Sequence, residues 1–328
     1  MDGNKVNVVG WYDKNNCGDE SYKLAFPKVF PSYDFVFSDS PIKNADAYIL
    51  GGGDIITEQA LSTFQAINKP KHIMSVTVSK KFPSQLFEGF RTIITRDNAS
   101  MNLLEQIGVS SLLYPDFSFS LNGNKENGKV LINKYFTKNR TEIYDKVVAV
   151  VINGNLIPEH GAAAYRQIRF ERFCFDLSIA IDETPASFIF IPFGTKSPWD
   201  DRIANAMVAS KCKWWKKNCI VFEEIGVQET LDIISACNAT ISSRLHSSIF
   251  SAATEVPFVD ITHSHKNKYL LETMKYNKVS ISYVDFSLSS MKSLLKTSLL
   301  SSSAEEIGSV VSMNKLLLRD LHKSIILT

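Results

Sequence analysis

The chain has 328 residues, of which 45% are hydrophobic, and its 36 basic and 34 acidic residues give a formal net charge of +2. This length and hydrophobic content suffice for one large core or for two cores of ordinary size. The near balance of charge excludes the strongly basic surface of a dedicated nucleic-acid binder and is compatible only with a local basic patch.

The first third of the chain alternates short β-branched apolar runs with segments of helical period. We expect strands at 6–10, 34–37, 47–50, 72–78 and 92–95, with helices at 19–26, 57–67, 83–88 and 97–107 between them. This alternation predicts a parallel sheet that is covered by helices on both faces.

A polar stretch from Leu121 to Lys146 interrupts this rhythm. We therefore predict an N-terminal Rossmann-like domain over 1–125, a linker over 126–145, and a C-terminal Rossmann-like domain with C-terminal helices over 146–328. The second series has expected strands at 147–152, 187–192, 219–222, 240–242, 258–261 and 279–282. Its expected helices lie near 161–181, 200–210, 227–236, 245–254, 265–274 and within 288–326. The pattern predicts two doubly wound α/β domains that face each other across a cleft, where ligands bind at the carboxyl ends of strands.

Cysteine usage and the start of the chain indicate the compartment. The five cysteines form no CxxC pair, which argues against disulfides and a zinc site and is typical of a reducing environment. The segment after Met1 lacks a signal-peptide core, and the longest apolar runs are only as long as strands. We predict a cytoplasmic protein without a transmembrane segment.

Two glycine-containing loops follow strands in the first domain. In the loop 10–20, a helix starts near Gly18 after Asn16, so its N–H groups can face an anion. Alternatively, Asp19 and Glu20 simply cap this helix. The spacing alone does not distinguish anion binding from capping. The triplet Gly51, Gly52 and Gly53 favours a loop that faces a ligand, because a generic turn rarely requires three glycines.

A third junction contains Arg96, directly after the strand at 92–95. Asp97 is typical of a helix N-cap. Arg96 fits either an anion in the cleft or an ion pair with Asp97 or Asp116, and the ion pair is the stronger of these two interpretations.

The fourth junction, Ser242-Ser243-Arg244-Leu245-His246-Ser247, is the strongest candidate. Arg244 and His246 fall in the first turn of a helix, where the dipole favours an anion, and imidazole can donate or shuttle a proton. A capped helix with a satisfied histidine is the structural alternative.

Two further segments carry chemically active side chains. His263-Ser264-His265-Lys266 follows the next strand and opens on the same side of the sheet; it lacks the neighbouring carboxylates or cysteines of a metal site. The stretch Lys-Cys-Lys-Trp-Trp-Lys-Lys at 211–217 fits either stacking on bases or sugars or a solvated helix end with half-buried tryptophans.

In this order the motifs resemble the polysaccharide pyruvyl transferase family. Five elements of the family have counterparts here: the GYxGxxNxGDE-like loop at 10–20, GGG at 51–53, RDxxS at 96–100, PD at 115–116 and RLHS at 244–247. The chain departs from the family at Trp11, where a tyrosine is usual, and at 263–266, where Tyr-x-x-Lys is often found.

The resemblance implies a fold similar to the GT-B glycosyltransferases and transfer of pyruvate from phosphoenolpyruvate to two sugar hydroxyls as a ketal, with no cofactor or metal. His246 is then the acid/base, with Asp19 or Glu20 as its partner. The implied donor-binding residues are Arg244, Arg96, Lys266, Asn16, Gly18, Gly51, Gly52, Gly53 and Ser247, and the acceptor-binding residues are His263 and His265.

Two other functions remain open at this point. The first is a GT-B glycosyltransferase that uses a nucleotide sugar, with a glycan, a lipid-linked sugar or a modified nucleobase as acceptor. The second is a family member that binds a glycan or a partner without turnover; the retained Arg244 and His246 argue against it.

Overall fold

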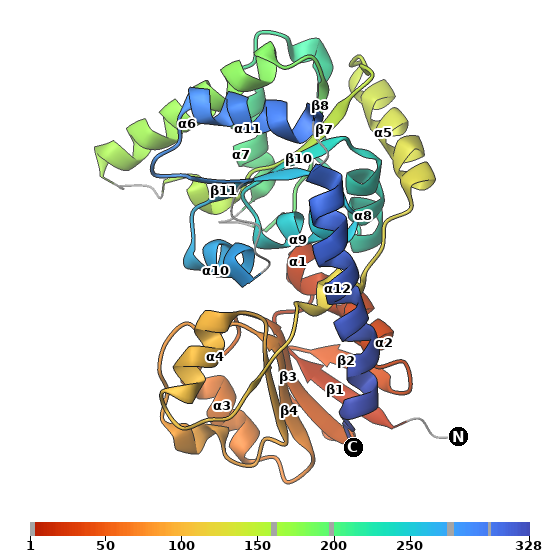
Figure 1. Ribbon diagram of the computed structural model, residues 1–328, viewed down its shortest axis with the longest axis vertical. Coiled ribbons are helices and arrows are strands. Elements are labelled where there is room, and N and C mark those ends of the chain that lie inside the picture. Colours follow the sequence, from red (N-terminus) through yellow and green to blue (C-terminus); the bar gives the residue numbers. More distant parts are fainter. Residues whose placement is uncertain (1–3, 159–162, 197–199, 274–278, 301–302) are drawn as a thin grey trace.

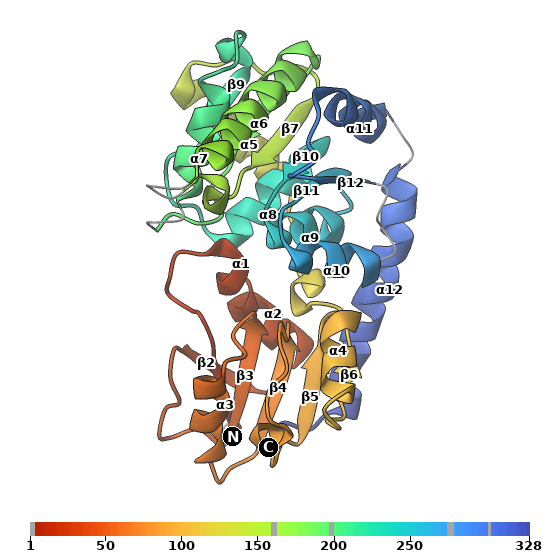
Figure 2. The same cartoon turned by 90° about the vertical axis from the view of Figure 1, so that its left-hand side faces the viewer.

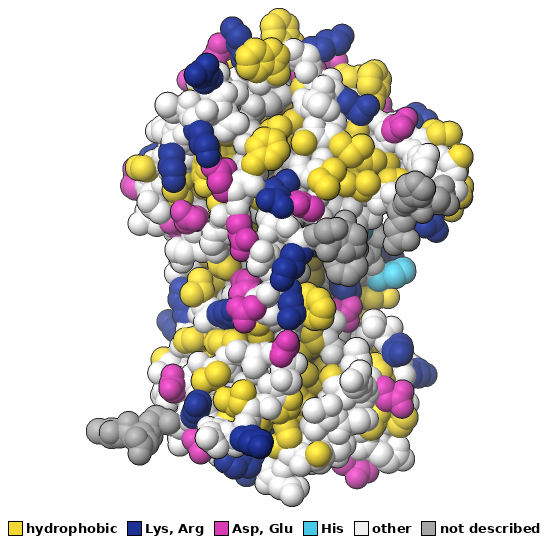
Figure 3. Space-filling view, turned by 180° about the vertical axis from the view of Figure 1, so that it is seen from behind, with side chains coloured by type: hydrophobic (Ala, Val, Ile, Leu, Met, Phe, Trp, Pro, Cys, Tyr) yellow, Lys and Arg dark blue, Asp and Glu magenta, His cyan; other side chains and the backbone are white. Residues whose placement is uncertain are grey.

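The computed structural model describes residues 4–158, 163–196, 200–273, 279–300 and 303–328, which form two α/β domains stacked end to end (Figure 1). A waist between the two domains is visible from behind (Figure 3). No helix in this described part of the chain combines the length and the apolar character that crossing a membrane requires.

The N-terminal domain is built on a six-stranded parallel sheet with the order β2-β1-β3-β4-β5-β6. Its strands are β1 (Lys5–Val9), β2 (Asp34–Ser38), β3 (Ala47–Gly53), β4 (Lys71–Val76), β5 (Thr92–Thr95) and the short β6 (Leu112–Leu113). Its helices are α1 (Cys17–Glu20), α2 (Tyr22–Val29), α3 (Glu58–Gln65) and α4 (Asn98–Glu105). Every residue of β3 and β4 is buried, as expected for central strands covered on both faces.

The C-terminal domain repeats this plan, with the order β12-β11-β10-β7-β8-β9. Its strands are β7 (Val147–Val151), β8 (Ser187–Phe190), β9 (Asn218–Ile220), β10 (Ala239–Ser242), β11 (Phe258–Thr262) and β12 (Ser280–Ser282). Its helices are α6 (Ala164–Glu183), α7 (Asp201–Ala209), α8 (Val227–Ala236), α9 (Leu245–Ala253), α10 (His265–Thr273) and α11 (Leu288–Leu300). All strand pairs in both sheets are parallel, so the predicted pair of doubly wound domains is confirmed.

The segment expected as a linker at 126–145 is largely a helix, α5 (Lys125–Asn139), which packs against α8. Its buried residues Leu131, Ile132, Tyr135 and Phe136 have helical spacing, although they are embedded in a polar sequence. A side chain at Gly128 would overlap the backbone of α8, so this glycine sets the close approach of the two helices. The polar composition therefore marks the solvent face of a helix rather than an extended connection.

The last helix, α12 (Ser303–Ser324), also departs from the expected domain division, because it runs from the C-terminal domain down along the N-terminal domain (Figures 1 and 2). Beyond it, the Leu327 N–H donates to the Tyr33 hydroxyl (3.0 Å), and the Leu327 carbonyl contacts Nε2 of His72 (3.0 Å). The end of the chain thus packs on the N-terminal sheet and ties the two domains together.

Candidate active site

A cavity of about 470 Å³ lies between the two domains, where strands of both sheets end. Side chains that follow β1, β3 and β5 line one wall, and side chains that follow β7, β10 and β11 line the other. Its polar lining includes Asn16, Asp19, Asp54, Arg96, Asn153, Asn155, Arg244, His246, His263, Ser264, Lys266 and Asn267. This position at the carboxyl ends of parallel strands is the usual ligand site of doubly wound sheets.

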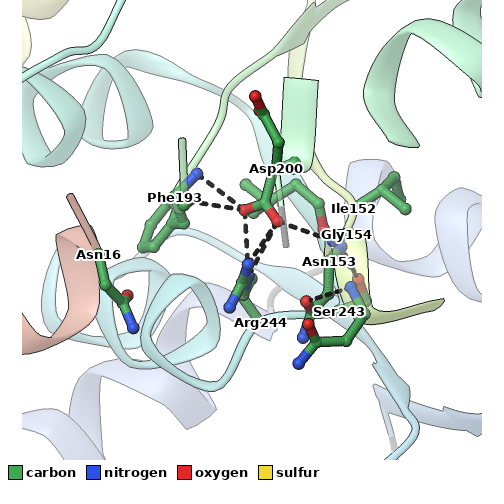
Figure 4. Close-up of polar contacts among 12 residues, drawn as sticks. Asn16, Ile152, Asn153, Gly154, Phe193, Asp200, Ser243 and Arg244 are labelled. Atoms are coloured by element: carbon green, nitrogen blue, oxygen red, sulfur yellow. Dashed lines mark hydrogen bonds and ion pairs between the residues drawn. The ribbon is translucent and has the colours of Figure 1, made fainter. Parts of the chain in front are cut away.

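Arg244 is held in the C-terminal wall by the buried carboxylate of Asp201. Its Nε lies 3.0 Å from Asp201 Oδ2, and its Nη2 lies 2.5 Å from Oδ1. The same carboxylate accepts backbone N–H groups from Gly154 (2.7 Å), Phe193 (3.0 Å) and Gly194 (2.9 Å). Figure 4 shows the Arg244 guanidinium directed at the carboxylate on which the contacts of this network converge. The guanidinium is therefore fixed in position and charge at the start of α9.

His246 lies in the first turn of α9 and is enclosed by side chains from both domains. The Tyr22 ring meets its imidazole edge-on, with ring centroids 5.6 Å apart. Its Nε2 lies 3.8 Å from Oδ2 of Asp116 and has no hydrogen-bond partner among the described residues. Burial, the largest effect, and the nearby Arg96 lower the pKa of His246 to about 4 against the attraction of Asp116. The imidazole is therefore neutral at pH 7 and able to accept a proton.

Gly18 makes room for this imidazole. A Cβ atom at Gly18 would overlap the His246 ring, so no side chain fits at this position of α1. Gly18 was expected to bind the donor through its backbone. What the structure shows is that its lack of a side chain lets α1 approach α9.

Asp19 faces the cavity and Glu20 does not. Oδ2 of Asp19 accepts a hydrogen bond from Nδ2 of Asn16 (2.5 Å), and burial raises the pKa of Asp19 to about 7 against the attraction of Arg96 and Arg244. Glu20 instead accepts the N–H of Asp13 (2.5 Å), pairs with Lys23 (2.7 Å) and lines a separate cavity on the other side of α1. Of the two carboxyls expected as partners of His246, the structure brings only Asp19 into the cleft.

Arg96 forms the ion pair that the sequence left open as an alternative. Its Nη1 donates to Asp116 (2.7 Å) and to the Tyr22 hydroxyl (2.9 Å), while its Nε donates to Thr77 (2.9 Å). All four side chains are buried. Arg96 lines the cavity, but its main contacts position Asp116 and Tyr22 around His246.

The segment after β11 divides between the cavity and solvent. Lys266 forms an ion pair with Asp54 of the opposite domain across the cleft, and both residues line the cavity. His263 contacts Nδ2 of Asn153 through Nε2 (3.1 Å), and burial lowers its pKa to about 4. His265, expected at the acceptor site, is exposed, stacks on Tyr269 and lies outside the cavity lining.

Three other expected donor ligands build the site without lining the cavity. Ser247 is buried, and its hydroxyl bonds the Arg244 carbonyl (2.8 Å) and the Ser242 hydroxyl. The Gly51 carbonyl accepts the Tyr12 hydroxyl (2.8 Å), and Gly52, at φ +80°, faces the ring of Tyr22, which a side chain would overlap. Gly53 does line the cavity; at φ +97° its Cβ position lies 2.9 Å from Oδ1 of Asp19.

Neither the role of Tyr22 nor that of Asp201 is evident from local sequence pattern. Tyr22 sits at an ordinary apolar position of α2, and Asp201 reads as a first-turn carboxylate of α7. Only their tertiary contacts show that one shapes the His246 pocket and the other holds Arg244. Among the described residues, no three His, Cys, Asp or Glu side chains group closely enough to hold a metal ion.

Sequence comparison assigns the chain to a family. A model of the polysaccharide pyruvyl transferase family matches residues 8–265. No curated protein matches the chain.

Solved structures of trehalose-phosphate synthases share the fold. The enzyme from Burkholderia multivorans has a TM-score of 0.53 at 10% identity, covering 86% of this chain and 70% of its own. The one from Burkholderia xenovorans in complex with glucose-6-phosphate has a TM-score of 0.54 at 10% identity, covering 86% and 74%. The E. coli structure bound with UDP-2-fluoro glucose has a TM-score of 0.51 at 10% identity, with the same coverage of 86% and 74%. These similarities confirm the expected GT-B-like pair of Rossmann-like domains.

Proposed function

We propose that this chain, which belongs to the polysaccharide pyruvyl transferase family, moves pyruvate from phosphoenolpyruvate onto two hydroxyls of a sugar acceptor as a ketal. The observation that carries the proposal is a buried carboxyl and a buried imidazole in the cleft whose pKa values stand in the reverse of their usual order. Burial raises the pKa of Asp19 to about 7 and lowers that of His246 to about 4. At neutral pH the carboxyl can hold a proton and the imidazole can accept one, which gives an acid and a base in one cavity.

The reaction needs such a pair. Asp19 protonates the methylene carbon of phosphoenolpyruvate, which becomes the methyl group of an oxocarbenium-like species at C2. A first acceptor hydroxyl adds to C2 while His246 removes its proton. The bond from C2 to the phosphate oxygen then breaks, the second hydroxyl closes the ketal, and the departing phosphate takes the proton of that hydroxyl. The proton held by His246 passes to solvent and Asp19 takes one up from solvent, which restores both groups. The balance is one donor plus one diol giving one ketal plus phosphate, with no redox step.

The charges in the cleft support binding of an anionic donor. Arg244 is fixed by Asp201, and the first turn of α9 adds its helix dipole. Lys266 is held by Asp54 in a partly exposed ion pair. We infer that the donor's carboxylate or phosphate takes the place of Asp54 at Lys266, because a partly exposed pair is the most easily exchanged. His263 and Asn153, on the same wall, are the proposed contacts to the acceptor.

The alternative is glycosyl transfer from a nucleotide sugar to a glycan, a lipid-linked sugar or a modified nucleobase. The observation that favours it is the fold shared with trehalose-phosphate synthases, some of which are described as UDP-forming. Both reactions pass through oxocarbenium character and release an anionic group, so the same cleft suits either one.

Ligand-dependent thermal stability separates these two functions. The chain is titrated separately with phosphoenolpyruvate, UDP and UDP-glucose, and a ligand at a hundred times its Kd stabilises the folded state by about 2.7 kcal/mol. We expect stabilisation by phosphoenolpyruvate. Stabilisation by UDP or UDP-glucose without any response to phosphoenolpyruvate refutes pyruvyl transfer.

Turnover then tests the residue roles. Phosphate release from phosphoenolpyruvate is followed in the presence of a panel of pyranoside diols. His246→Ala is expected to lose most of the turnover and stay folded, whereas His322→Ala, an exposed histidine at the end of α12, keeps it. Full activity in His246→Ala would rule out the assigned base.

A further inference from the structure

The loop 211–217 between α7 and β9 exposes two adjacent tryptophans. Trp214 is 66% exposed and Trp215 is 58% exposed, more than the half-buried state expected from the sequence. Lys211, Lys213 and Lys216 beside them are also exposed, and the loop contains no carboxylate. Exposed apolar residues that are scattered singly are normal, whereas adjacent ones that form a patch mark an interaction surface.

The structure holds this loop in a fixed shape. Cys212 and Lys217 at its two ends are buried. The Asp182 carboxylate accepts the backbone N–H groups of Lys213 (2.8 Å) and Trp214 (3.1 Å). Nζ of Lys217 donates to three carbonyls at the end of α6, at 2.8–3.0 Å. The tryptophans therefore point outward because their backbone is anchored, not because the loop lacks structure.

Further apolar side chains lie beside the loop. Ile143 and Tyr144, which precede β7, are 42% and 44% exposed, and the neighbouring Glu142 N–H donates to the Lys216 carbonyl (2.6 Å). We call the surface formed by Ile143, Tyr144 and residues 211–216 the distal tip. It lies at the amino ends of β7 and β9, opposite the cleft, and the exposed Glu142 and Asp145 flank Ile143 and Tyr144. Figure 3 shows apolar and basic side chains at that end of the molecule, with acidic ones among them.

A cavity of about 570 Å³ adjoins the distal tip. It is lined mainly by apolar atoms, including those of Pro185 and Leu299, and by Lys146, Lys292 and Lys296. The carboxylates of Asp145 and Glu183 line it as well, and Glu183 forms an ion pair with Lys292. The cavity thus extends the apolar surface of the tip, and its lysines outnumber its carboxylates by three to two.

We propose that the distal tip docks on the surface of an anionic lipid bilayer. Tryptophan and tyrosine favour the headgroup region, where the ring is buried and the polar edge stays hydrated, and lysines beside them are attracted to anionic headgroups. Sugar and base sites are concave, whereas these tryptophans project into solvent from an anchored loop. The inference does not depend on the donor that the cleft uses.

Co-sedimentation with vesicles tests the proposal. The full chain is mixed with vesicles of phosphatidylcholine alone or of phosphatidylcholine containing phosphatidylglycerol, and bound protein and tryptophan emission are measured. We expect binding to the anionic vesicles with a blue shift of the emission, weakened by added salt. No binding to anionic vesicles, or equal binding to neutral ones, overturns the proposal.

Three variants assign the binding to the tip. Trp214→Ala with Trp215→Ala is expected to weaken the partition coefficient on the order of tenfold, and Lys213→Ala with Lys216→Ala by about 30-fold. The matched control is Trp11→Ala, which removes a 51% exposed tryptophan from the other domain and leaves binding unchanged. Circular dichroism checks that each variant is folded. Vesicle binding that is insensitive to both tip variants, or tryptophan-dependent binding of an oligonucleotide or glycan without vesicle binding, overturns the lipid assignment.

Discussion

Asp201→Asn is the most informative test of how the C-terminal wall of the cleft is built. The Asp201 carboxylate is fully buried and compensates the charge of Arg244, with the closest N–O distance at 2.5 Å. It also accepts three backbone N–H groups from the loops after β7 and β8. Asparagine keeps the shape but removes the charge and replaces one acceptor oxygen with a donor.

The expected cost follows from this geometry. Removing one partner of a buried ion pair typically costs about 3–5 kcal/mol, because the remaining charge stays buried without compensation. In Asp201→Asn the amide group is also turned toward at least one backbone N–H, so a buried donor loses its acceptor at a further 1–3 kcal/mol or so. Arg244 keeps some exposure and can recover part of its hydration. We therefore expect a loss near the lower end of this sum, about 4 kcal/mol, in the free energy of unfolding.

Urea denaturation followed by circular dichroism measures this loss. The matched control is Glu126→Gln, which removes the carboxylate of an exposed ion pair with Lys129 (2.8 Å). The control leaves the denaturation midpoint unchanged, since exposed pairs contribute little. If Asp201→Asn also leaves the midpoint unchanged, the carboxylate is not the element that holds Arg244 in the wall.

Three further predictions concern the cleft. Gly18→Ala is expected to destabilise the fold by about 1–3 kcal/mol, because the added methyl group overlaps the His246 ring. The control Gly308→Ala, which has open space around it in α12, is neutral or stabilising. Equal denaturation midpoints for the two variants would contradict the contact between Gly18 and His246. The pKa of Asp19 in the folded protein, about 7, lies above the ordinary 3.8, so the folded protein holds the proton more tightly and loses stability as pH rises between these values. Asp19→Asn therefore becomes more stable than the parent toward high pH, by about 4 kcal/mol at most. A difference in unfolding free energy that does not change with pH refutes this. For His246 the sign is reversed, because its pKa of about 4 lies below the ordinary 6.5 and the folded protein loses stability as pH falls through this range. In the same denaturation series, the unfolding free energy of His246→Gln is expected to rise relative to that of the parent only in acid. A relative rise at neutral pH would contradict a buried neutral imidazole.

The sequence by itself determined the architecture. Buried parallel strands are apolar throughout, so runs such as 47–50 and 147–152 are recognisable as strands from the sequence. The order of strands and helices along the chain then leaves few possible sheet topologies. The junction at Arg244 and His246 could be placed at a carboxyl end for the same reason, since each motif directly follows a predicted strand. Local pattern also predicted the Asp97 cap of α4, which accepts the Ser100 N–H (2.8 Å).

Only the tertiary structure decided which side chains share the cavity. Asp19 and Glu20 are neighbours in sequence, but about 100° separates them around a helix, so Asp19 faces the cavity between the domains and Glu20 faces Lys23. The pairing of Arg96 with Asp116 joins positions 20 residues apart. Such contacts depend on how two sheets and their loops meet, and no local periodicity encodes that.

The domain boundaries were likewise decided by tertiary contacts that local sequence pattern does not encode. The solvent face of α5 is polar and reads as a linker, whereas its buried face is defined by α8. Likewise α12 has the pattern of an ordinary amphipathic helix, and its role as a tie between domains appears only where Leu327 meets Tyr33 and His72. Sequence fixes which residues seek burial; the packed fold decides against what they are buried.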